Sequence, residues 1–360
     1  MTARPALSQV LTNTAAGLYC PAGGFHIDPV RAVECALITH AHSDHARAGH
    51  GAVLASADTL ALMAIRYGEN FCRTRQIANW GECTRLGDVS VGFHPAGHVL
   101  GSAQIAIDST QAGASGRIVF SGDYKRQRDP TCMPFEPVRC DIFITEATFA
   151  LPVFNHPEPM GEIRKLLRSL ATFPERTHVV GVYSLGKGQR VAAMLREAGY
   201  ERPLFLHGAL EKITSHYETR GIDFGDWRKI AASDRKDLAG EIVLCPPGAV
   251  ATPWAQAFSA PLNVSASGWM RVRARARQRN VELPLVISDH AGWQEICDTI
   301  VETRCKEVWI THGEADALMR WAKLRQMRAA PLHLKGYGEE EELALDAPHD
   351  VDDGRTGAEA

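Results

Sequence analysis

Three histidines and one aspartate are packed into six consecutive positions, as His40-Ala-His42-Ser-Asp44-His45. Neutral imidazole and carboxylate groups are the side chains that hold zinc and similar divalent metals in proteins. A polar surface turn would account for one lone histidine, but not for four candidate ligands at this spacing. The segment therefore predicts a metal site.

Six short apolar runs along the chain end at or near a residue that can bind a metal or move a proton. Each run is rich in β-branched or aromatic residues and is bounded by turn residues, as a buried strand should be. In layered α/β folds the loops at strand ends converge to make a site. We therefore expect one shared site, built from His40, His98, Asp123, Glu146, His290 and His312.

The elements that position these residues alternate between strands and helices, which predicts the α/β class. "FHPAGHVLGSAQIAID" followed by "GRIVFSGD" predicts consecutive antiparallel strands, and hence stacked sheets with helices outside. The length of 360 residues suggests about two domains. Helices are expected over 56–68, 160–173, 188–199 and 315–327.

Composition narrows the cellular context. The nine cysteines are scattered singly with no C-x-x-C pair, which indicates a reducing compartment and argues against a cysteine zinc site. The N-terminus lacks the apolar stretch of a signal peptide, and no window approaches 18 apolar residues. We expect a soluble cytoplasmic protein with no membrane contact.

The overall net charge of −3 combines two different regions. Residues 339–360 carry nine acidic residues and one basic residue, so we expect a disordered acidic tail. The remaining body has 38 basic and 33 acidic residues, a net charge of +5. That mildly basic body permits a polyanionic partner without requiring one.

The segment "GVYSLGKGQR" (181–190) resembles a phosphate-binding P-loop but has Gly188 where magnesium would need Ser or Thr. Free backbone N–H groups at a helix start, beside a lysine, still suit a phosphate. We expect that phosphate to belong to a nucleic-acid backbone, contacted by Ser184, Lys187 and Gln189.

A second basic segment, "SGWMRVRARARQRN" (267–280), places five arginines at strict alternation. In a strand they would share one face, whereas in a helix they would scatter around it. The alternative is a solvated basic stretch. Because the run leads directly into "LPLVISDH", we expect Arg271, Arg273 and Arg275 to contact phosphates. Trp269 either stacks on a base or packs internally.

Together these motifs resemble a known superfamily. "THAHSDH", "PAGHVLGSAQ" and "SGDYK" are similar to the metal-binding motifs of the metallo-β-lactamase superfamily. "ITEATF", "ISDHAGW" and "ITHGE" are similar to the three extra motifs of its nucleic-acid-processing β-CASP branch. Within that branch the chain resembles the bacterial DNA ligase-associated exonucleases over roughly residues 15–335, through segments that include "YSLGKGQR" and "SASGWMRVR".

The resemblance implies a four-layer αββα metallo-β-lactamase fold with an inserted α/β β-CASP domain. The first metallo-β-lactamase part would cover 1–150, the insertion 151–282 and the second metallo-β-lactamase part 283–338. The resemblance also implies two divalent ions, Zn²⁺ with Mn²⁺ as the alternative, about 3.5–4 Å apart as in two-metal phosphodiesterases. One ion would be held by His40, His42 and His98, the other by Asp44, His45 and His312, with Asp123 bridging them.

Two of these assignments have rivals in the sequence. His94 lies four residues before His98 and could take its place, or could support the ligands or the core instead. Asp123 in "SGD" could simply cap a turn. Its position at a strand end and its match to the family motif favour the ligand role.

The activity implied by the resemblance is a metal-dependent DNA exonuclease that acts at DNA ends in repair, in the 5′→3′ direction. Asp44, Glu146 and His290 would be catalytic, with His290 as general acid polarised by Glu146. A DNA ligase and a helicase of the same pathway are the expected partners. The alternatives are a β-CASP RNA nuclease, a small-molecule metallohydrolase and a non-catalytic nucleic-acid-binding subunit.

Overall fold

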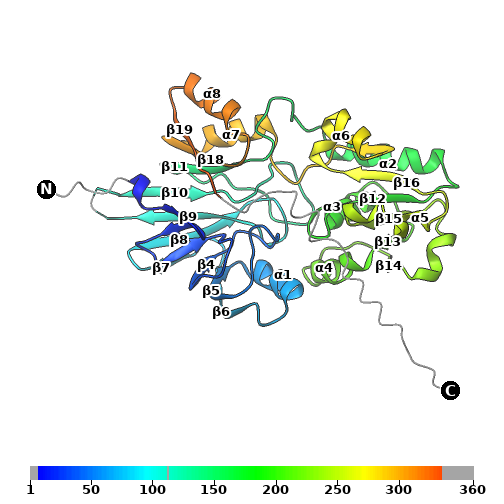
Figure 1. The fold of residues 1–360 in the computed structure, drawn as a ribbon, viewed down its shortest axis with the longest axis horizontal. Helices are drawn as coiled ribbons and strands as arrows, with labels where there is room; N and C mark the ends of the chain where they lie inside the picture. Colours follow the sequence, from blue (N-terminus) through cyan, green and yellow to red (C-terminus); the bar gives the residue numbers. More distant parts are fainter. Residues whose placement is uncertain (1–6, 112, 335–360) are drawn as a thin grey trace, which may run out of the picture.

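The computed structural model describes residues 7–111 and 113–334, and these form three β-sheets with helices on their outer faces. Two sheets lie together at one end of the molecule, and the third lies at the other end among the green and yellow helices (Figure 1). The predicted acidic tail, 339–360, lies outside the described residues.

The first sheet has the order β1-β2-β3-β4-β5-β6 and is antiparallel up to β3, then parallel. Helix α1 (Ala57–Tyr67) packs Leu60 and Met63 against it, and the Ser56 hydroxyl caps α1 by accepting the Thr59 N–H. The strands are β1 (Thr12–Thr14), β2 (Gly17–Cys20), β3 (Phe25–Ile27), β4 (Cys35–Leu37), β5 (His50–Ala55) and β6 (Cys72–Ile77).

The second sheet has the order β19-β18-β11-β10-β9-β8-β7. Strands β7 to β10 form the antiparallel meander that the sequence predicts, and β11, β18 and β19 add in parallel. Helices α7 (Trp293–Thr303) and α8 (Asp316–Leu324) cover its outer face. The strands are β7 (Cys83–Leu86), β8 (Val89–Pro95), β9 (Ala103–Ser109), β10 (Gly116–Phe120), β11 (Ile142–Ala147), β18 (Glu307–Gly313) and β19 (Arg328–Pro331).

These two sheets pack face to face through an apolar core. Leu18, Phe25 and Leu54 of the first sheet meet Ile105, Phe120 and Ile144 of the second, and all six side chains are buried. Alternate residues of a strand point to opposite faces, so each sheet is left with a second apolar face that a helix must cover. The layers therefore run α1, first sheet, second sheet, α7 with α8. This is the predicted four-layer αββα arrangement.

The third sheet is wholly parallel, with the order β14-β13-β15-β12-β16-β17, and helices cover both of its faces. Its edge strand, Leu283–Leu285, pairs with β16. The third sheet therefore extends past residue 282, where the sequence analysis expected the insertion to end. The strands are β12 (His178–Gly181), β13 (Leu204–Leu206), β14 (Trp227–Lys229), β15 (Ile242–Cys245), β16 (Leu262–Ala266) and β17 (Leu283–Leu285). The α-helices are α2 (Pro159–Thr172), α3 (Lys187–Glu197), α4 (Gly208–Thr219), α5 (Pro253–Gln256) and α6 (Arg273–Gln278). The 3₁₀ turns are η1 (Leu7–Gln9), η2 (Ala232–Asp237), η3 (Pro247–Ala249) and η4 (Gly268–Arg271).

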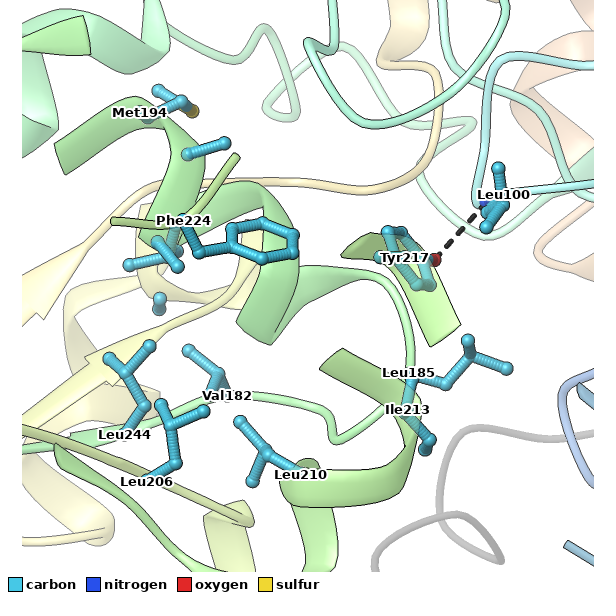
Figure 2. Packing of buried hydrophobic residues seen from close by; sticks show 14 of the residues in the cluster. Leu100, Val182, Leu185, Met194, Leu206, Leu210, Ile213, Tyr217, Phe224 and Leu244 are labelled. Atoms are coloured by element: carbon cyan, nitrogen blue, oxygen red, sulfur yellow. Dashed lines mark hydrogen bonds between the residues drawn. The ribbon is translucent and has the colours of Figure 1, made fainter. Parts of the chain in front are cut away.

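One continuous core joins the third sheet to the α1 side of the first sheet. Tyr217 of α4 is buried beside Phe224, and its hydroxyl accepts the Leu100 N–H at 3.2 Å, from the loop between β8 and β9 (Figure 2). Leu185 lies in the same cluster, from the loop that precedes α3. The inserted segment is thus packed onto the two-sheet body rather than tethered to it.

All four predicted helices are confirmed, as α1, α2, α3 and α8. The arginine run forms the 3₁₀ turn η4 and helix α6, so the one-face alternative for its five arginines is wrong. Within the described residues, no helix combines the length and apolar character needed to cross a membrane.

Candidate metal centre

The residues that close the six apolar runs come together in space. Three groups of potential ligand atoms form, and within each group all atoms lie within 4.8 Å of one another. Asp123 belongs to every group and so marks the centre of the site. The groups are His40, His42, His98 and Asp123; His45, Asp123 and His312; and Asp123, Glu146 and His290.

The first half-site consists of His40, His42 and His98. His42 Nδ1 lies 3.1 Å from His40 Nε2 and 3.0 Å from His98 Nε2. Burial, reinforced by neighbouring imidazoles, holds the pKa of His40 and of His98 well below the ordinary value of 6.5. Burial also lowers the pKa of His42, to about 4. The three rings are therefore neutral at pH 7.

The outer nitrogen of each of these rings faces an acceptor. His42 Nε2 lies 3.1 Å from the Leu185 carbonyl oxygen, and His98 Nδ1 lies 2.7 Å from the Asp289 carbonyl oxygen. His40 Nδ1 lies 3.0 Å from the Thr39 hydroxyl, whose own proton goes to a carboxylate. Each outer nitrogen must therefore carry the single ring proton, because the groups that face it accept hydrogen bonds.

The inner nitrogens, His40 Nε2, His42 Nδ1 and His98 Nε2, are then left without protons and face one another. Three lone pairs converging at about hydrogen-bond distance repel one another unless a cation lies among them. This arrangement fits a metal ion and is hard to reconcile with a purely structural histidine cluster. The chemistry of the donor set suits zinc and similar divalent ions.

The second half-site consists of His45 and His312. His45 Nε2 lies 3.3 Å from Asp123 Oδ2, and its Nδ1 lies 2.8 Å from Asp28 Oδ2. Burial lowers the pKa of His45, but Asp123 and Asp44 outweigh it and raise that pKa well above 6.5. A metal at this half-site would therefore compete with a proton for His45.

Asp28 is the residue of the site that the sequence analysis missed. It is fully buried after β3, and it also accepts the Thr39 N–H at 2.8 Å and the Thr39 hydroxyl at 2.6 Å. Asp28 thus orients His45 directly, and His40 through Thr39. Its only sequence signal is a single aspartate after a short apolar run, in "FHIDP".

His312 reaches the site through an irregularity in β18. Glu146 pairs with Thr311, but Ala147 pairs with Gly313, so His312 bulges out of the ladder with φ of 51°. Bulges re-aim side chains beside functional sites. Here the bulge brings His312 Nδ1 to 3.8 Å from Asp123 Oδ1. Burial and the nearby His45 lower the pKa of His312 to about 4.

Asp44 approaches the centre from its edge. Its Oδ2 lies 3.5 Å from His45 Nε2, although Asp44 falls outside the three tight groups. Its Oδ1 is buried and has no hydrogen-bond partner among the described residues. A buried carboxylate oxygen without a partner is unfavourable, and a cation beside it would relieve that.

Asp123 is the carboxylate shared by both half-sites. Its oxygens lie 3.6 Å from His40 Nε2, 3.9 Å from His98 Nε2 and 3.3 Å from His45 Nε2. Burial raises its pKa, but His45 and His290 outweigh burial and bring the pKa well below 3.8. Asp123 is therefore ionised, as a bridging ligand must be.

Glu146 and His290 form a dyad that adjoins Asp123, with His290 Nδ1 3.9 Å from Asp123 Oδ2. Glu146 Oε2 lies 2.8 Å from His290 Nδ1, and Glu146 also accepts the Tyr124 N–H and the Thr148 hydroxyl, each at 2.7 Å. Burial raises the pKa of Glu146, and His290 only partly offsets it. The carboxylate thus holds the His290 ring through Nδ1. His94, the rival of His98, lies in β8 outside the three groups.

The predicted nucleic-acid contacts at the start of α3 and in the loop before it are largely engaged inside the protein. Lys187 is buried, with Nζ 3.2 Å from Asp289 Oδ2. The Gln189 side chain accepts the Gly186 N–H and donates to the Ser184 carbonyl and the Thr214 hydroxyl. Ser184 is buried as well. These side chains shape the loop, and a direct contact with phosphate stays a prediction.

The second predicted contact surface adjoins the Glu146–His290 dyad. The Trp269 ring packs against Phe149, 4.8 Å between centroids, and Phe149 in turn lies 6.0 Å from the His290 ring. The Arg275 guanidinium sits 3.8 Å from the centroid of the Trp269 ring. Arg271, Arg273 and Arg275 are all exposed. Their contact with phosphates also stays a prediction.

Comparison with known proteins places this site in context. No family model matches the chain. A probable DNA ligase from Opitutus terrae is 29% identical over 336 residues, which cover 91% of this chain and 31% of that protein. Ribonuclease TTHA0252 from Thermus thermophilus is 24% identical over 88% of this chain and 89% of its own. Endoribonuclease ysh1 from Emericella nidulans is 30% identical over 37% of this chain and 14% of its own.

A solved structure of a protein of unknown function from Enterococcus faecalis superposes with a TM-score of 0.56, over 83% of this chain and 79% of that one. Its 14% identity speaks to the fold alone. This chain spans under a third of the probable DNA ligase, but nearly all of the Thermus ribonuclease. The four-layer fold, the histidine–aspartate centre and these relatives agree with the resemblance of the chain to the β-CASP branch of the metallo-β-lactamase superfamily.

Proposed function

We propose that this protein is a metal-dependent exodeoxyribonuclease that hydrolyses phosphodiester bonds at DNA ends, in the 5′→3′ direction, during DNA repair in the cytoplasm. The convergence of three proton-free imidazole nitrogens supports the metal-dependent chemistry. The observation that favours DNA is the match of 91% of this chain to a protein named as a probable DNA ligase.

In this proposal His40, His42 and His98 hold one divalent ion, and Asp44, His45 and His312 hold the other. Asp123 contacts both. Zn²⁺ is the expected metal and Mn²⁺ the alternative, since imidazole suits zinc while carboxylate also suits manganese. When bound, such a pair of ions neutralises the phosphate and lowers the pKa of water to near neutrality.

The dyad supplies the proton that the leaving oxygen requires. Glu146 holds His290 by Nδ1 and favours the protonated ring, so that Nε2 can donate to the leaving 3′-oxygen. The buried position of Glu146 strengthens this pairing, because few waters compete for it. Asp44 stands beside His45, where it can also orient a reacting water.

We place the substrate along the junction between the β-CASP insertion, 151–282, and the metallo-β-lactamase parts, 1–150 and 283–338. Arg271, Arg273, Arg275 and Trp269 would contact the strand, with the loop of Ser184, Lys187 and Gln189 behind it. The partners we propose are a DNA ligase and a helicase of the same repair pathway.

An RNA nuclease is the second candidate, because several relatives bear ribonuclease or endoribonuclease names. The two substrates differ by one hydroxyl per nucleotide. The assay must therefore compare DNA and RNA of one sequence directly.

The test uses purified protein loaded with Zn²⁺ or Mn²⁺ and four substrates: linear single-stranded DNA, duplex DNA, RNA of the same sequence, and circular single-stranded DNA. Each linear strand carries a label at its 5′ end or at its 3′ end. We expect the 5′ label to appear first as short product, while circular DNA stays intact. Faster cleavage of RNA would favour the second candidate, and cleavage of the circle would contradict an exonuclease. Metal binding without cleavage of any substrate would favour a small-molecule hydrolase or a binding subunit.

A further inference from the structure

The P-loop-like segment of the insertion, residues 185–190, lies directly against the first half-site. Its Leu185 carbonyl accepts the N–H of His42 Nε2 at 3.1 Å. This hydrogen bond leaves Nδ1 of His42 without a proton and turned toward His40 and His98. A backbone atom of the insertion thus sets both the tautomer and the orientation of a candidate ligand.

A second link from the same segment passes through Asp289. His98 donates its Nδ1–H to the Asp289 carbonyl at 2.7 Å, which leaves Nε2 facing the first half-site. The carboxylate of Asp289 lies 3.2 Å from Lys187 Nζ and 3.5 Å from Arg190 Nη1. Lys187 also donates to the Ile287 carbonyl, and Arg190 donates to the Ser288 carbonyl.

Both cations are held inside the protein. The Arg190 side chain is fully buried, and the Lys187 side chain is 3% exposed. Buried charges are tolerated only when they are paired and hydrogen-bonded. Removing one member of such a pair strongly destabilises the protein, because the other charge is left buried without its partner. Here the partners of both cations are the backbone and carboxylate of 287–289, which carry the acceptor for His98. Asp129 completes the cluster, 3.6 Å from Arg190 Nε and 2.5 Å from Lys125 Nζ.

We propose that residues 185–190 act as positioning residues for one metal: the Leu185 carbonyl and the Lys187–Arg190–Asp289 cluster orient His42 and His98, so that the insertion completes the first half-site. The inference depends on the metal centre proposed above. The second half-site is supported from the metallo-β-lactamase part, through Asp28 beside His45 and the bulge of β18 at His312. The two ions should therefore respond differently to changes in the insertion.

The test is a metal titration of Arg190→Met with Zn²⁺ against a chromophoric chelator. We expect one of the two bound equivalents to weaken by about 10–100-fold, the range found when groups supporting a metal ligand are removed. The other equivalent should keep its wild-type affinity. Arg190→Lys keeps a cation in the cluster and should restore part of the loss.

Arg196→Met is the matched control on the same helix. Arg196 also donates to backbone carbonyls, those of Phe224, Tyr200, Arg202 and Asp226, but these lie within the insertion, away from the metal centre. This variant should lower the thermal unfolding temperature yet bind two Zn²⁺ ions as the wild type does.

The absorption spectrum of bound Co²⁺ gives a second readout, which general destabilisation would not move. In Arg190→Met the bands of one Co²⁺ should shift in energy and intensity, because the geometry at His42 and His98 changes. If Arg190→Met does not fold, Asp289→Asn removes the clamped charge while keeping the carbonyl that receives His98. It should show the same selective loss.

Wild-type affinity for both ions in Arg190→Met, or equal weakening of both ions in Arg190→Met and Arg196→Met, would overturn the inference. Failure of the wild type to bind two ions would instead overturn the metal centre itself. The two failures are therefore distinguishable without any nuclease assay.

Discussion

His290 differs from His42 and His98, the ligands proposed for the first half-site, in what its ring contacts. A carboxylate holds its Nδ1 at 2.8 Å, whereas backbone carbonyls hold the outer nitrogens of His42 and His98. A carboxylate favours the charged imidazolium, and a carbonyl merely selects one neutral tautomer. His45 is also held by a carboxylate, with Asp28 2.8 Å from its Nδ1, so the contrast distinguishes His290 from the first half-site alone. The general-acid role proposed for His290 therefore needs a test of its own.

His290→Ala should therefore keep both metals and DNA binding, yet lose about 10²–10⁴-fold in the cleavage of normal DNA, as expected for the loss of a general acid. A nitrophenyl phosphodiester has a better leaving group and should lose much less. His312→Ala should instead lose the second metal and fail on both substrates. Metal analysis and the two rates decide the matter: metal loss in His290→Ala, or equal harm to both substrates, would contradict the general acid.

Asp123→Ala should remove metal content and activity together, because its carboxylate lies within 4 Å of nitrogens from both half-sites. The measurement is metal stoichiometry by elemental analysis after gel filtration. Asp141→Ala, outside the three groups, is the control and should retain two ions. A normal metal stoichiometry in Asp123→Ala would contradict the assignment of Asp123 as the shared ligand.

The four residues at positions 40–45 could be predicted from sequence because their types are rare in such dense spacing. The others could be predicted because each ends a strand-like apolar run: His98, Asp123, Glu146, His290 and His312. Asp28 could not, since a lone aspartate after an apolar run is also a common turn residue. Its role depends on β3 pairing with β4, which brings Asp28 beside Thr39. Such pairings depend on tertiary structure and leave no local pattern.

At the scale of elements, the arginine run shows where prediction from residue spacing fails. Alternation at every second residue fits an exposed face of a strand, and the same residues also tolerate a helix. Burial of Met270 and Ala276 selects the helical form, because these two apolar side chains pack inward. The segment 185–190, at the start of α3, shows the same limit: its composition suggested a phosphate cradle, yet Lys187 and Arg190 pair with Asp289.

The helical form makes the arginines unequal. Arg275 lies over the Trp269 ring, whose other contacts lead through Phe149 to His290. Arg275→Glu should therefore weaken DNA binding more than Arg277→Glu, and should reduce the slope of log K against log salt by about 1. Hydrolysis of the nitrophenyl diester should barely change. The measurement is the DNA affinity of both variants at several salt concentrations. Equal effects of the two charge reversals would mean that the arginine run is a solvated surface without a specific phosphate contact.

At the scale of the whole molecule, a polar seam joins the insertion to the body beside the shared core. Asp58 of α1 lies 3.3 Å from His216 of α4 and also pairs with Arg220. Burial raises the pKa of Asp58, but His216 and Arg220 outweigh it and leave the pKa below 3.8. A carboxyl group whose pKa is lower in the folded protein than in the unfolded one stabilises the fold at pH values above its unfolded pKa, about 3.9. This contribution disappears as the pH falls through the folded pKa.

Asp58→Asn should therefore lower the unfolding temperature of the chelator-treated protein at pH 6, and the gap from wild type should close below about pH 4. The effect should stay under about 1 kcal/mol, because the pair is partly exposed and screened by salt. Thermal scans from pH 3 to pH 7 measure it. A gap that is constant across that range would mean that Asp58 acts by packing alone.

The order of the sheets could not be read from the sequence even where the strands could. The same run that ends at His290 begins with β17, and it joins the third sheet rather than the two-sheet body. Long-range pairing of this kind depends on which apolar faces remain uncovered once the layers assemble. The pattern of a single strand does not contain that information.

The bulge at His312 has a consequence for how this protein could change over evolutionary time. A positive φ of 51° is unfavourable for any residue with a Cβ, by roughly 1–2 kcal/mol, and glycine adopts it freely. Elsewhere in a strand, alanine is more stable than glycine; at 312 the order should reverse, with His312→Gly unfolding at a higher temperature than His312→Ala in metal-free protein. Calorimetry of the two variants tests this ordering. On the ligand role proposed for His312, a copy of this protein released from catalysis would gain stability when glycine replaces that histidine, so position 312 would set stability against metal binding.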